Sequence, residues 1–189
     1  MLGAIIGDIV GSVYEFDNCR SKNFAPFFHA HSFFTDDTIC TVAVADALLS
    51  GERPAKSFKA WGHRYWENGG WGRGFARWLR SEDLEPYGSY GNGAAMRVSP
   101  AGLLGKTLEQ TLQFAAAVTE VTHNHPEGMK GAAATAMAIF LARSGTKPDN
   151  IRQQISERFG YDLAMTVDEI RPHYRFDESC QRTVPQALV

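Results

Sequence analysis

Two adjacent carboxylates between two hydroxyls give this chain its clearest candidate for chemistry, in the segment Thr35-Asp36-Asp37-Thr38. Carboxylate and hydroxyl oxygens are hard ligands, which suit Mg²⁺ or Ca²⁺ better than Zn²⁺. The same residues also have the pattern of a helix start, with Thr35 as N-cap and two acids in the first turn. Because acidic first turns are common, the segment taken alone favours a capped helix start over a metal site.

Two further acids, Asp8 and Glu15, lie in the largely apolar stretch LGAIIGDIVGSVYEF, residues 2–16. On a single helix, their spacing of seven places both carboxylates on the same side. Glycines recur at every fourth position from Gly3 to Gly11, a ridge that lets another helix approach closely. Acids on a helix usually face water, but most of this surface is apolar. We therefore expect a buried helix, in which acids need a partner or a metal.

Two loops carry residues suited to a ligand. Tyr90-Gly91-Asn92-Gly93-Ala94-Ala95 leads into a helix expected at about 93–98. Its N–H groups could reach a phosphate, although Asn-Gly is also an ordinary turn. The segment THNHPEG carries His123 and His125 before a proline-initiated helix. This pattern fits the rim of a site and, equally, a loop whose histidine caps its own turn.

Length and composition predict one domain over residues 1–189, with a hydrophobic fraction of 44% that can build a core. The net charge of −2 and the lack of a basic run argue against nucleic acid as the main partner. Three widely spaced cysteines without a CxxC motif favour a reduced, cytoplasmic protein. No signal-peptide pattern or membrane-length apolar run is present, so we expect no membrane association.

Helical spacing of apolar residues recurs along the chain, and no useful strand alternation appears, which predicts an all-α fold. Gly51 is the expected C-cap of the helix that follows Thr35, and Pro54 the start of the next one. Residues 160–178 read as irregular. The helices are expected at about 2–16, 36–50, 54–68, 93–98, 107–121, 127–143 and 149–159, with a short amphipathic turn or helix at 71–80.

The last residues, Thr183 to Val189, have the pattern of a helix start that stops after barely one turn. A lone turn is marginal without packing. We therefore expect the chain to be cut inside an element, as a fragment or a naturally split protein. Such a cut leaves an apolar face that a second copy of the chain could cover as a homo-oligomer.

Four separated segments, GAIIGDIVGSVYEF, FTDDT, GNGAAMRVSP and THNHPEG, together resemble the ADP-ribosylglycohydrolase family in order and spacing. The resemblance implies an all-α, orthogonal multi-helical bundle with two Mg²⁺ ions. It also implies hydrolysis of the N- or O-glycosidic bond that joins ADP-ribose to an acceptor. The partner would be an ADP-ribosylated protein or a small-molecule conjugate of ADP-ribose.

The resemblance also assigns roles to individual residues. Thr35, Asp36 and Asp37 would be metal ligands, with both aspartates and Glu15 in the catalytic centre. Asp8 would not bind the metal itself but would hold these ligands in position. The family's other ligands come from a C-terminal Asp-x-Asp-Thr segment that this sequence lacks, so only half of the metal cage is expected. The substrate-binding residues would be Gly91, Asn92, Gly93, Ala94 and His123.

The sequence therefore predicts a magnesium-dependent hydrolase that removes ADP-ribose from a modified acceptor. The missing ligands leave open a second class, a non-catalytic binding or structural protein on the same fold. A magnesium-dependent phosphoester hydrolase is a third reading, which product analysis would separate from glycosidic cleavage. The acceptor has no readable signature in the loops 17–32 and 160–178.

Overall fold

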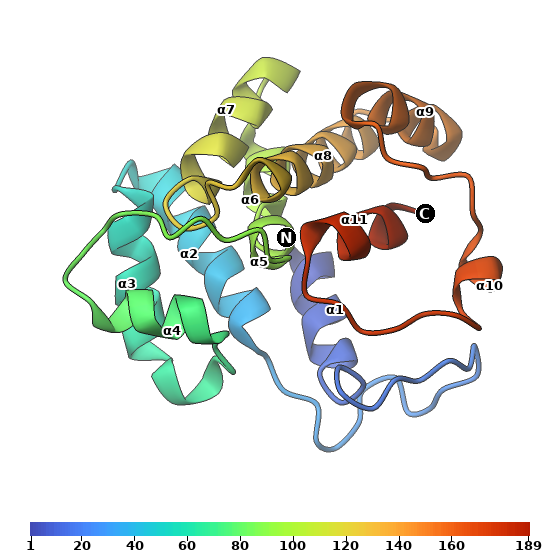
Figure 1. The fold of residues 1–189 in the computed structure, drawn as a ribbon, viewed down its shortest axis with the longest axis horizontal. Helices are drawn as coiled ribbons and strands as arrows, with labels where there is room; N and C mark the ends of the chain where they lie inside the picture. The colour runs from blue at the N-terminus through green and yellow to red at the C-terminus, as the bar shows by residue number, and fades with distance from the viewer.

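Helices form all the regular structure in the computed structural model, which describes residues 1–189 and contains no β-strand (Figure 1). The predicted all-α class is therefore confirmed. The elements are α1 (Leu2–Gly11), α2 (Asp36–Ser50), α3 (Pro54–Arg64), the 3₁₀ turn η1 (Trp66–Asn68), α4 (Arg73–Arg80), α5 (Gly93–Met96), α6 (Ser99–Leu104), α7 (Leu108–Thr119), α8 (Pro126–Arg143), α9 (Pro148–Phe159), α10 (Val167–Ile170) and α11 (Cys180–Leu188).

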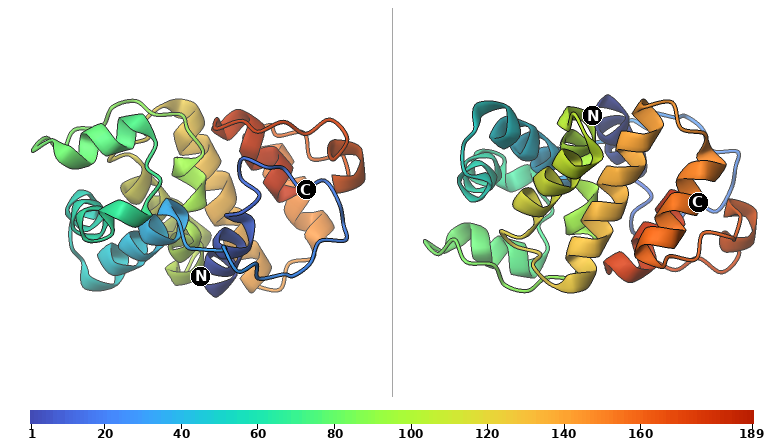
Figure 2. Two further views of the ribbon diagram at one scale, coloured as in Figure 1. Left: turned by 90° about the horizontal axis from the view of Figure 1, so that it is seen from below. Right: turned by 90° about the horizontal axis from the view of Figure 1, so that it is seen from above.

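The alanine-rich helix α8 runs through the middle of the bundle and packs against α5, α6, α7, α9 and α11 (Figure 2). Its small side chains allow close approach of its neighbours. A Cβ at Gly131 of α8 would lie only 2.8 Å from Cys180 Sγ of α11, and one at Gly102 of α6 only 2.7 Å from Ile139 Cβ. Since real Cβ atoms do not approach so closely, glycine is required at both helix contacts.

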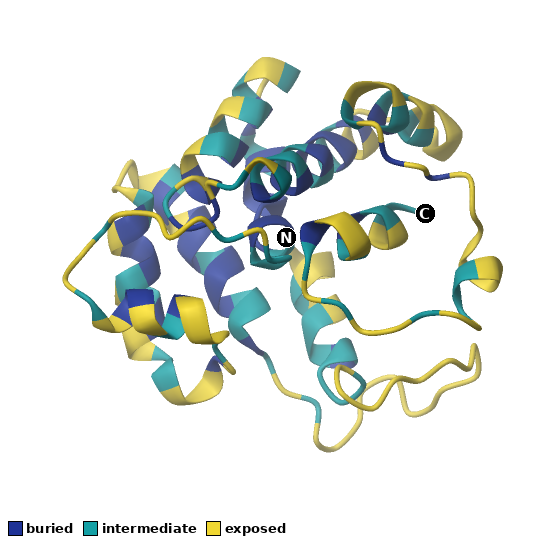
Figure 3. Cartoon of the chain, in the orientation of Figure 1, coloured by how far each residue is buried: buried dark blue, intermediate teal, exposed yellow.

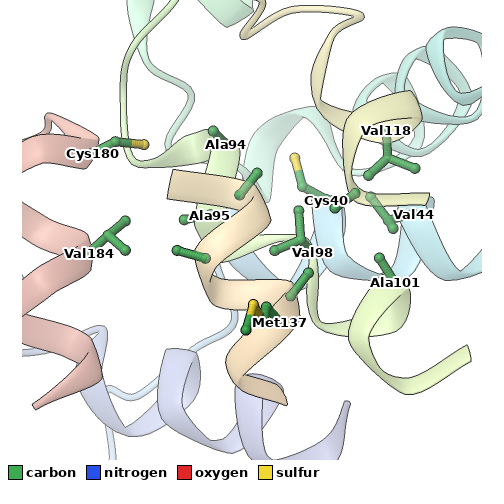
Figure 4. Packing of buried hydrophobic residues seen from close by; sticks show 14 of the residues in the cluster. Cys40, Val44, Ala94, Ala95, Val98, Ala101, Val118, Met137, Cys180 and Val184 are labelled. Atoms are coloured by element: carbon green, nitrogen blue, oxygen red, sulfur yellow. The ribbon is translucent and has the colours of Figure 1, made fainter. Parts of the chain in front are cut away.

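The core is one continuous cluster to which residues distant in sequence contribute (Figure 4). Helix α2 supplies Cys40 and Val44, while Cys180 and Val184 come from α11 on the opposite side of α8. Between these two helices lie the short helices α5 and α6, with Ala94, Ala95, Val98, Ala101 and Met137 of α8 among the buried residues. Helix α2 and the last helix, α11, are thereby joined through one hydrophobic core.

Helix α2 begins and ends where its capping residues predict. The Thr35 side chain accepts a hydrogen bond from the Asp37 N–H, and Gly51 ends the helix in the left-handed conformation with φ 75°. Only glycine adopts this conformation without strain, which is why the helix stops there. Both predicted caps are confirmed, and the acids Asp36 and Asp37 lie in the first turn.

Helix α1 differs from its prediction in length and burial. It ends at Gly11, so Glu15 lies in the turns that follow and not on the helix. Of its residues only Val10 is buried, and a Cβ added at Gly3, Gly7 or Gly11 would meet no atom within 4 Å. The expectations of a buried helix and a close-packed glycine ridge were therefore wrong. The reason is that α1 lies at the edge of the bundle, with α2 as its main neighbour.

The C-terminal helix also differs from its prediction, because α11 begins at Cys180 and not at Thr183. The Cys180 N–H donates to the Tyr90 carbonyl (3.0 Å), and the Thr183 hydroxyl donates back to the Asp177 carbonyl (2.6 Å). Thr183 therefore lies inside the helix, as does Pro185. The preceding segment, predicted as irregular, contains the short helix α10 in a largely exposed connection (Figure 3). No helix is long and apolar enough to cross a membrane.

Candidate functional site

A cleft of about 770 Å³ opens where the end of α1, the start of α2 and the loops before α5 and α11 meet. It brings together eight of the nine predicted site residues, which come from separate parts of the chain. These are Glu15, Thr35, Asp36, Asp37, Gly91, Asn92 and Gly93, and His123 joins them from the loop after α7. Ala94 is the exception. It is fully buried in the core, and its N–H donates to the Gly91 carbonyl at 3.1 Å.

Asp8 holds the start of α2 in place at one wall of the cleft. Its carboxylate accepts hydrogen bonds from the Thr35 N–H (2.8 Å) and hydroxyl (2.7 Å). It also accepts from the N–H and hydroxyl of Thr38. These donors include backbone N–H groups that a helix start leaves without partners, so a carboxylate there is well accommodated. Asp8 thus fixes the direction in which Asp36 and Asp37 project.

The acids of this wall destabilise one another's charged forms. Burial, followed by the charge of Asp37, raises the pKa of Asp36 to about 7. Burial, followed by the charges of Asp8 and Glu15, raises the pKa of Asp37 to about 6. The pKa of Glu15 is raised by partial burial, by Asp8 and by Glu178. None of these acids forms an ion pair with a lysine or arginine, so their negative charge is uncompensated within the protein.

Uncompensated carboxylates of this kind fit a hard divalent cation in ligand type and in charge. The candidate ligands are Thr35, Asp36 and Asp37, all of which provide oxygen atoms. The arrangement is nevertheless only part of a coordination shell, because no group of three His, Cys, Asp or Glu side chains converges closely enough to hold a metal. The donor chemistry therefore fits magnesium, and the ligand set within these residues is incomplete.

Another part of the cleft wall is built from the glycine loop before α5. An isolated antiparallel bridge joins Gly91 to Ser179, and the Asn92 N–H donates to the Glu178 carbonyl at 2.6 Å. The Gly91 N–H donates to the Ser89 hydroxyl at 3.2 Å. Two of the N–H groups that the sequence offered to a phosphate are therefore used by the protein itself. The Gly93 N–H, in contrast, has no acceptor within the chain.

Arg97 and His123 lie behind this loop and are almost entirely buried, with 1% and 5% of their surfaces exposed. Arg97 makes no ion pair, and its guanidinium lies over the Phe58 ring at 4.3 Å. A Cβ at Gly93 would lie 2.9 Å from His123 Nε2, so the absence of a side chain there leaves room for the imidazole. This wall therefore carries a positive charge and hydrogen-bond donors, in contrast to the acidic wall.

Glu178 and Arg97 are among the cleft residues that lie outside the predicted set of site residues. Glu178 comes from the segment before α11 and raises the pKa of Glu15 by its charge. No local pattern marks it, since the backbone bridge to Gly91 connects positions far apart in the chain. Arg97 had a detectable signal, because it is a single charge in the small and apolar run AAMRVSP. A lone charge in such a run indicates either a core ion pair or a ligand site.

The fold and the cleft together define an all-α protein with a cleft that is acidic on one wall and positively charged on another. The chain belongs to the ADP-ribosylglycohydrolase family, whose family model matches residues 1–187.

Similar proteins with curated descriptions agree with this assignment. The ADP-ribosylhydrolase ARH3 of Mus musculus is 29% identical over 77% of this chain and 48% of its own length. The ADP-ribosylhydrolase ARH3 of Bos taurus is 29% identical over 90% of this chain and 54% of its own length. That of Gallus gallus is 31% identical over 77% and 49%. The chain thus spans about half the length of the curated relatives it matches.

Proposed function

We propose that this protein hydrolyses the glycosidic bond between ADP-ribose and an acceptor, with ADP-ribose bound across the cleft. The observation that carries the proposal is the opposite polarity of the two cleft walls. ADP-ribose has a dianionic diphosphate at its centre and a neutral ribose at the reacting end. The diphosphate matches the wall of Arg97, His123 and the Gly93 N–H, and the reacting ribose then lies toward Glu15, Asp36 and Asp37.

In this arrangement the residues of the acidic wall act at the anomeric carbon. Cleavage of a glycosidic bond passes through a state with positive charge on the sugar. The carboxylate of Glu15 stabilises that charge and accepts a proton from the attacking water, whose oxygen forms the new bond to the anomeric carbon. The acceptor leaves with the bonding electron pair and takes up a proton. Either an N- or an O-glycosidic bond can follow this course.

Magnesium is part of the proposal, with Thr35, Asp36 and Asp37 as the ligands that this chain provides. When bound, the cation would hold the ribose hydroxyls and polarise the site. The support is the uncompensated charge of the two aspartates, whose pKa values are raised to about 7 and about 6 by burial and by neighbouring carboxylates. Asp8 contributes by keeping the start of α2 rigid through Thr35 and Thr38.

The raised pKa values predict that stabilisation by Mg²⁺ depends strongly on pH. At pH 5 both Asp36 and Asp37 are mostly protonated, and a cation must displace those protons. At pH 7.5 both are mostly ionised. Excess Mg²⁺ should therefore raise the Tm by several degrees at pH 7.5 and by much less at pH 5, as measured by differential scanning fluorimetry. An equal shift at both pH values, or a shift that survives in an Asp36→Asn/Asp37→Asn variant, would contradict the assigned ligands.

The activity itself is tested by incubating the protein with Mg²⁺ and peptides that carry ADP-ribose on arginine or on serine. We expect free ADP-ribose, identified by mass spectrometry, from one of these substrates. A phosphoester hydrolase would release AMP or phosphate instead. Appearance of those products without ADP-ribose would reject glycosidic cleavage.

A non-catalytic role is the second candidate, and the incomplete ligand set favours it. A cleft with the same polarity could bind ADP-ribose without cleaving its conjugates. Calorimetry with ADP-ribose, carried out beside the activity assay, separates the two candidates. Binding without release of ADP-ribose from any conjugate would identify a binding protein.

A further inference from the structure

Three buried side chains form a continuous hydrogen-bonded chain that ends at the cleft. Arg97 follows α5, while Thr122 and His123 lie in the loop between α7 and α8. Arg97 Nη2 donates to Thr122 Oγ1 at 2.7 Å, and Thr122 Oγ1 lies 2.8 Å from His123 Nδ1. Thr122 has no exposed surface at all. Water therefore has no access to the middle of this chain.

The directions of these hydrogen bonds follow from the donors available. Arginine stays charged in proteins and can only donate, so Thr122 Oγ1 is the acceptor of the first bond. The single hydroxyl proton of Thr122 has His123 Nδ1 as its one available acceptor. With a proton on Nδ1, that hydroxyl proton would be buried without a partner, which costs about 1–3 kcal/mol. Nδ1 is therefore the acceptor, and the proton of the neutral imidazole is on Nε2.

A doubly protonated imidazole is also disfavoured at this position. It would place a second positive charge next to Arg97, which has no carboxylate partner. Burial, followed by the charge of Arg97, lowers the pKa of His123 well below its ordinary value. The other titratable side chain in contact with the ring is Tyr87, at 6.1 Å between ring centroids. Tyr87 is neutral, because burial raises the pKa of its phenol to about 12.

We propose that Arg97 and Thr122 are positioning residues that hold His123 as a neutral imidazole with its proton on Nε2, aimed into the cleft beside Gly93. Nε2 has no hydrogen-bond partner within the protein, and His123 lines the cleft. With Nε2 as a fixed donor beside the charge of Arg97, this wall recognises an anionic oxygen of the ligand. That oxygen belongs to a diphosphate if the proposed function holds, on which this part of the inference rests.

The position of the proton can be measured on the ligand-free protein. Nitrogen-15 NMR of the imidazole side chains, with His123 assigned by comparison with a His123→Gln variant, separates protonated from unprotonated ring nitrogens. At pH 7 we expect Nε2 in the protonated range and Nδ1 in the unprotonated range. A proton on Nδ1, or on both nitrogens, would overturn the proposal, and this measurement does not depend on any variant folding.

Two substitutions at Thr122 form a matched pair. Thr122→Ser keeps the hydroxyl and should keep the wild-type nitrogen shifts and the affinity for ADP-ribose. Thr122→Val keeps the shape but removes the hydroxyl, so Nδ1 loses its donor. We expect a mixture of tautomers and an affinity lower by roughly tenfold, the size of one lost charge-assisted hydrogen bond. Wild-type shifts in Thr122→Val would overturn the role of Thr122.

The same experiments keep the two proposals apart. If Nε2 carries the proton but the wild-type protein does not bind ADP-ribose, the proposed function fails and the role of Arg97 and Thr122 stands. If ADP-ribose binds and is released from a conjugate while the proton is on Nδ1, the proposed function stands and the positioning role fails.

Discussion

Replacing Asp36 with asparagine is expected to abolish release of ADP-ribose and, in the metal-free protein, to raise the Tm at pH 7.5. Activity should fall because the variant loses a cation ligand and the charge that faces the reacting ribose. A loss of at least about 100-fold corresponds to roughly 2.7 kcal/mol of transition-state stabilisation. Stability should rise because burial and Asp37 oppose ionisation of Asp36 in the folded state.

The sign of this stability change depends on pH. The pKa of Asp36 is raised from 3.8 to about 7 on folding. The contribution of protonated Asp36 to the stability of the fold is therefore present at low pH and is lost as the pH rises through about 7. Because asparagine does not ionise, the Asp36→Asn variant does not lose this stability at high pH. Its Tm should therefore be higher than that of the wild type by about 3–6 °C at pH 7.5 and differ little at pH 4. Thermal unfolding in the presence of a chelator measures both values.

Glu120 provides the control for this variant. It is exposed at the C-terminal end of α7 and makes no side-chain hydrogen bond or ion pair. Glu120→Gln should leave both activity and Tm unchanged. An Asp36→Asn protein that keeps wild-type activity, or that is less stable than wild type at pH 7.5, would show that Asp36 lacks the role assigned to it.

Replacing Gly128 with alanine should both destabilise the protein and weaken ligand binding. Gly128 lies in the first turn of α8, where a Cβ would lie 2.9 Å from the carbonyl oxygens of His123 and Ser89. Both obstacles are backbone atoms of the loops that build the cleft, so neither can rotate away. Overpacking of this kind costs about 1–3 kcal/mol, which for a chain of this size lowers the Tm by about 3–9 °C. Displacement of the His123 loop should also reduce the affinity for ADP-ribose.

A second helical glycine gives the matched control. A Cβ at Gly3 in α1 would meet no atom within 4 Å. Because alanine is favoured over glycine in a helix by about 0.5–1 kcal/mol, Gly3→Ala should leave the Tm unchanged or slightly higher. If the two substitutions had the same effect, close packing at Gly128 would not be the cause.

Local signals predicted most of the fold. Thr35 and Gly51 mark the ends of α2, and Pro54, Pro126 and Pro148 lie at the first positions of their helices. Such signals act within one turn of helix, so they can be read directly from the sequence. The residues proposed for the candidate site could be named from the sequence in a similar way, because the acidic and glycine-rich motifs are contiguous in sequence, and their roles stay predictions.

Features that depend on neighbours far along the chain could not be predicted. The glycine pattern of α1 suits a buried contact, but no atom lies within 4 Å of a Cβ placed at these glycines, because α2 packs against another part of the helix, and that outcome depends on the whole bundle. The approach of Glu178 to Glu15 depends on the bridge between Gly91 and Ser179. The start of α11 at Cys180 follows from its hydrogen bond to Tyr90. Each of these is a tertiary interaction that overrides a reasonable local pattern.

The bridge between Gly91 and Ser179 also has a thermodynamic consequence. The glycine loop and the start of α11 share hydrogen bonds, and the Cys180 thiol donates to the Gly91 carbonyl at 3.1 Å. Detachment of α11 therefore removes hydrogen bonds that hold the glycine loop, so detachment of the helix and loss of order in the loop are coupled. A ligand that binds only the ordered loop shifts this equilibrium toward the docked helix. Occupancy of the cleft should thus be reported by amide hydrogen exchange in α11, a helix that the ligand does not need to touch.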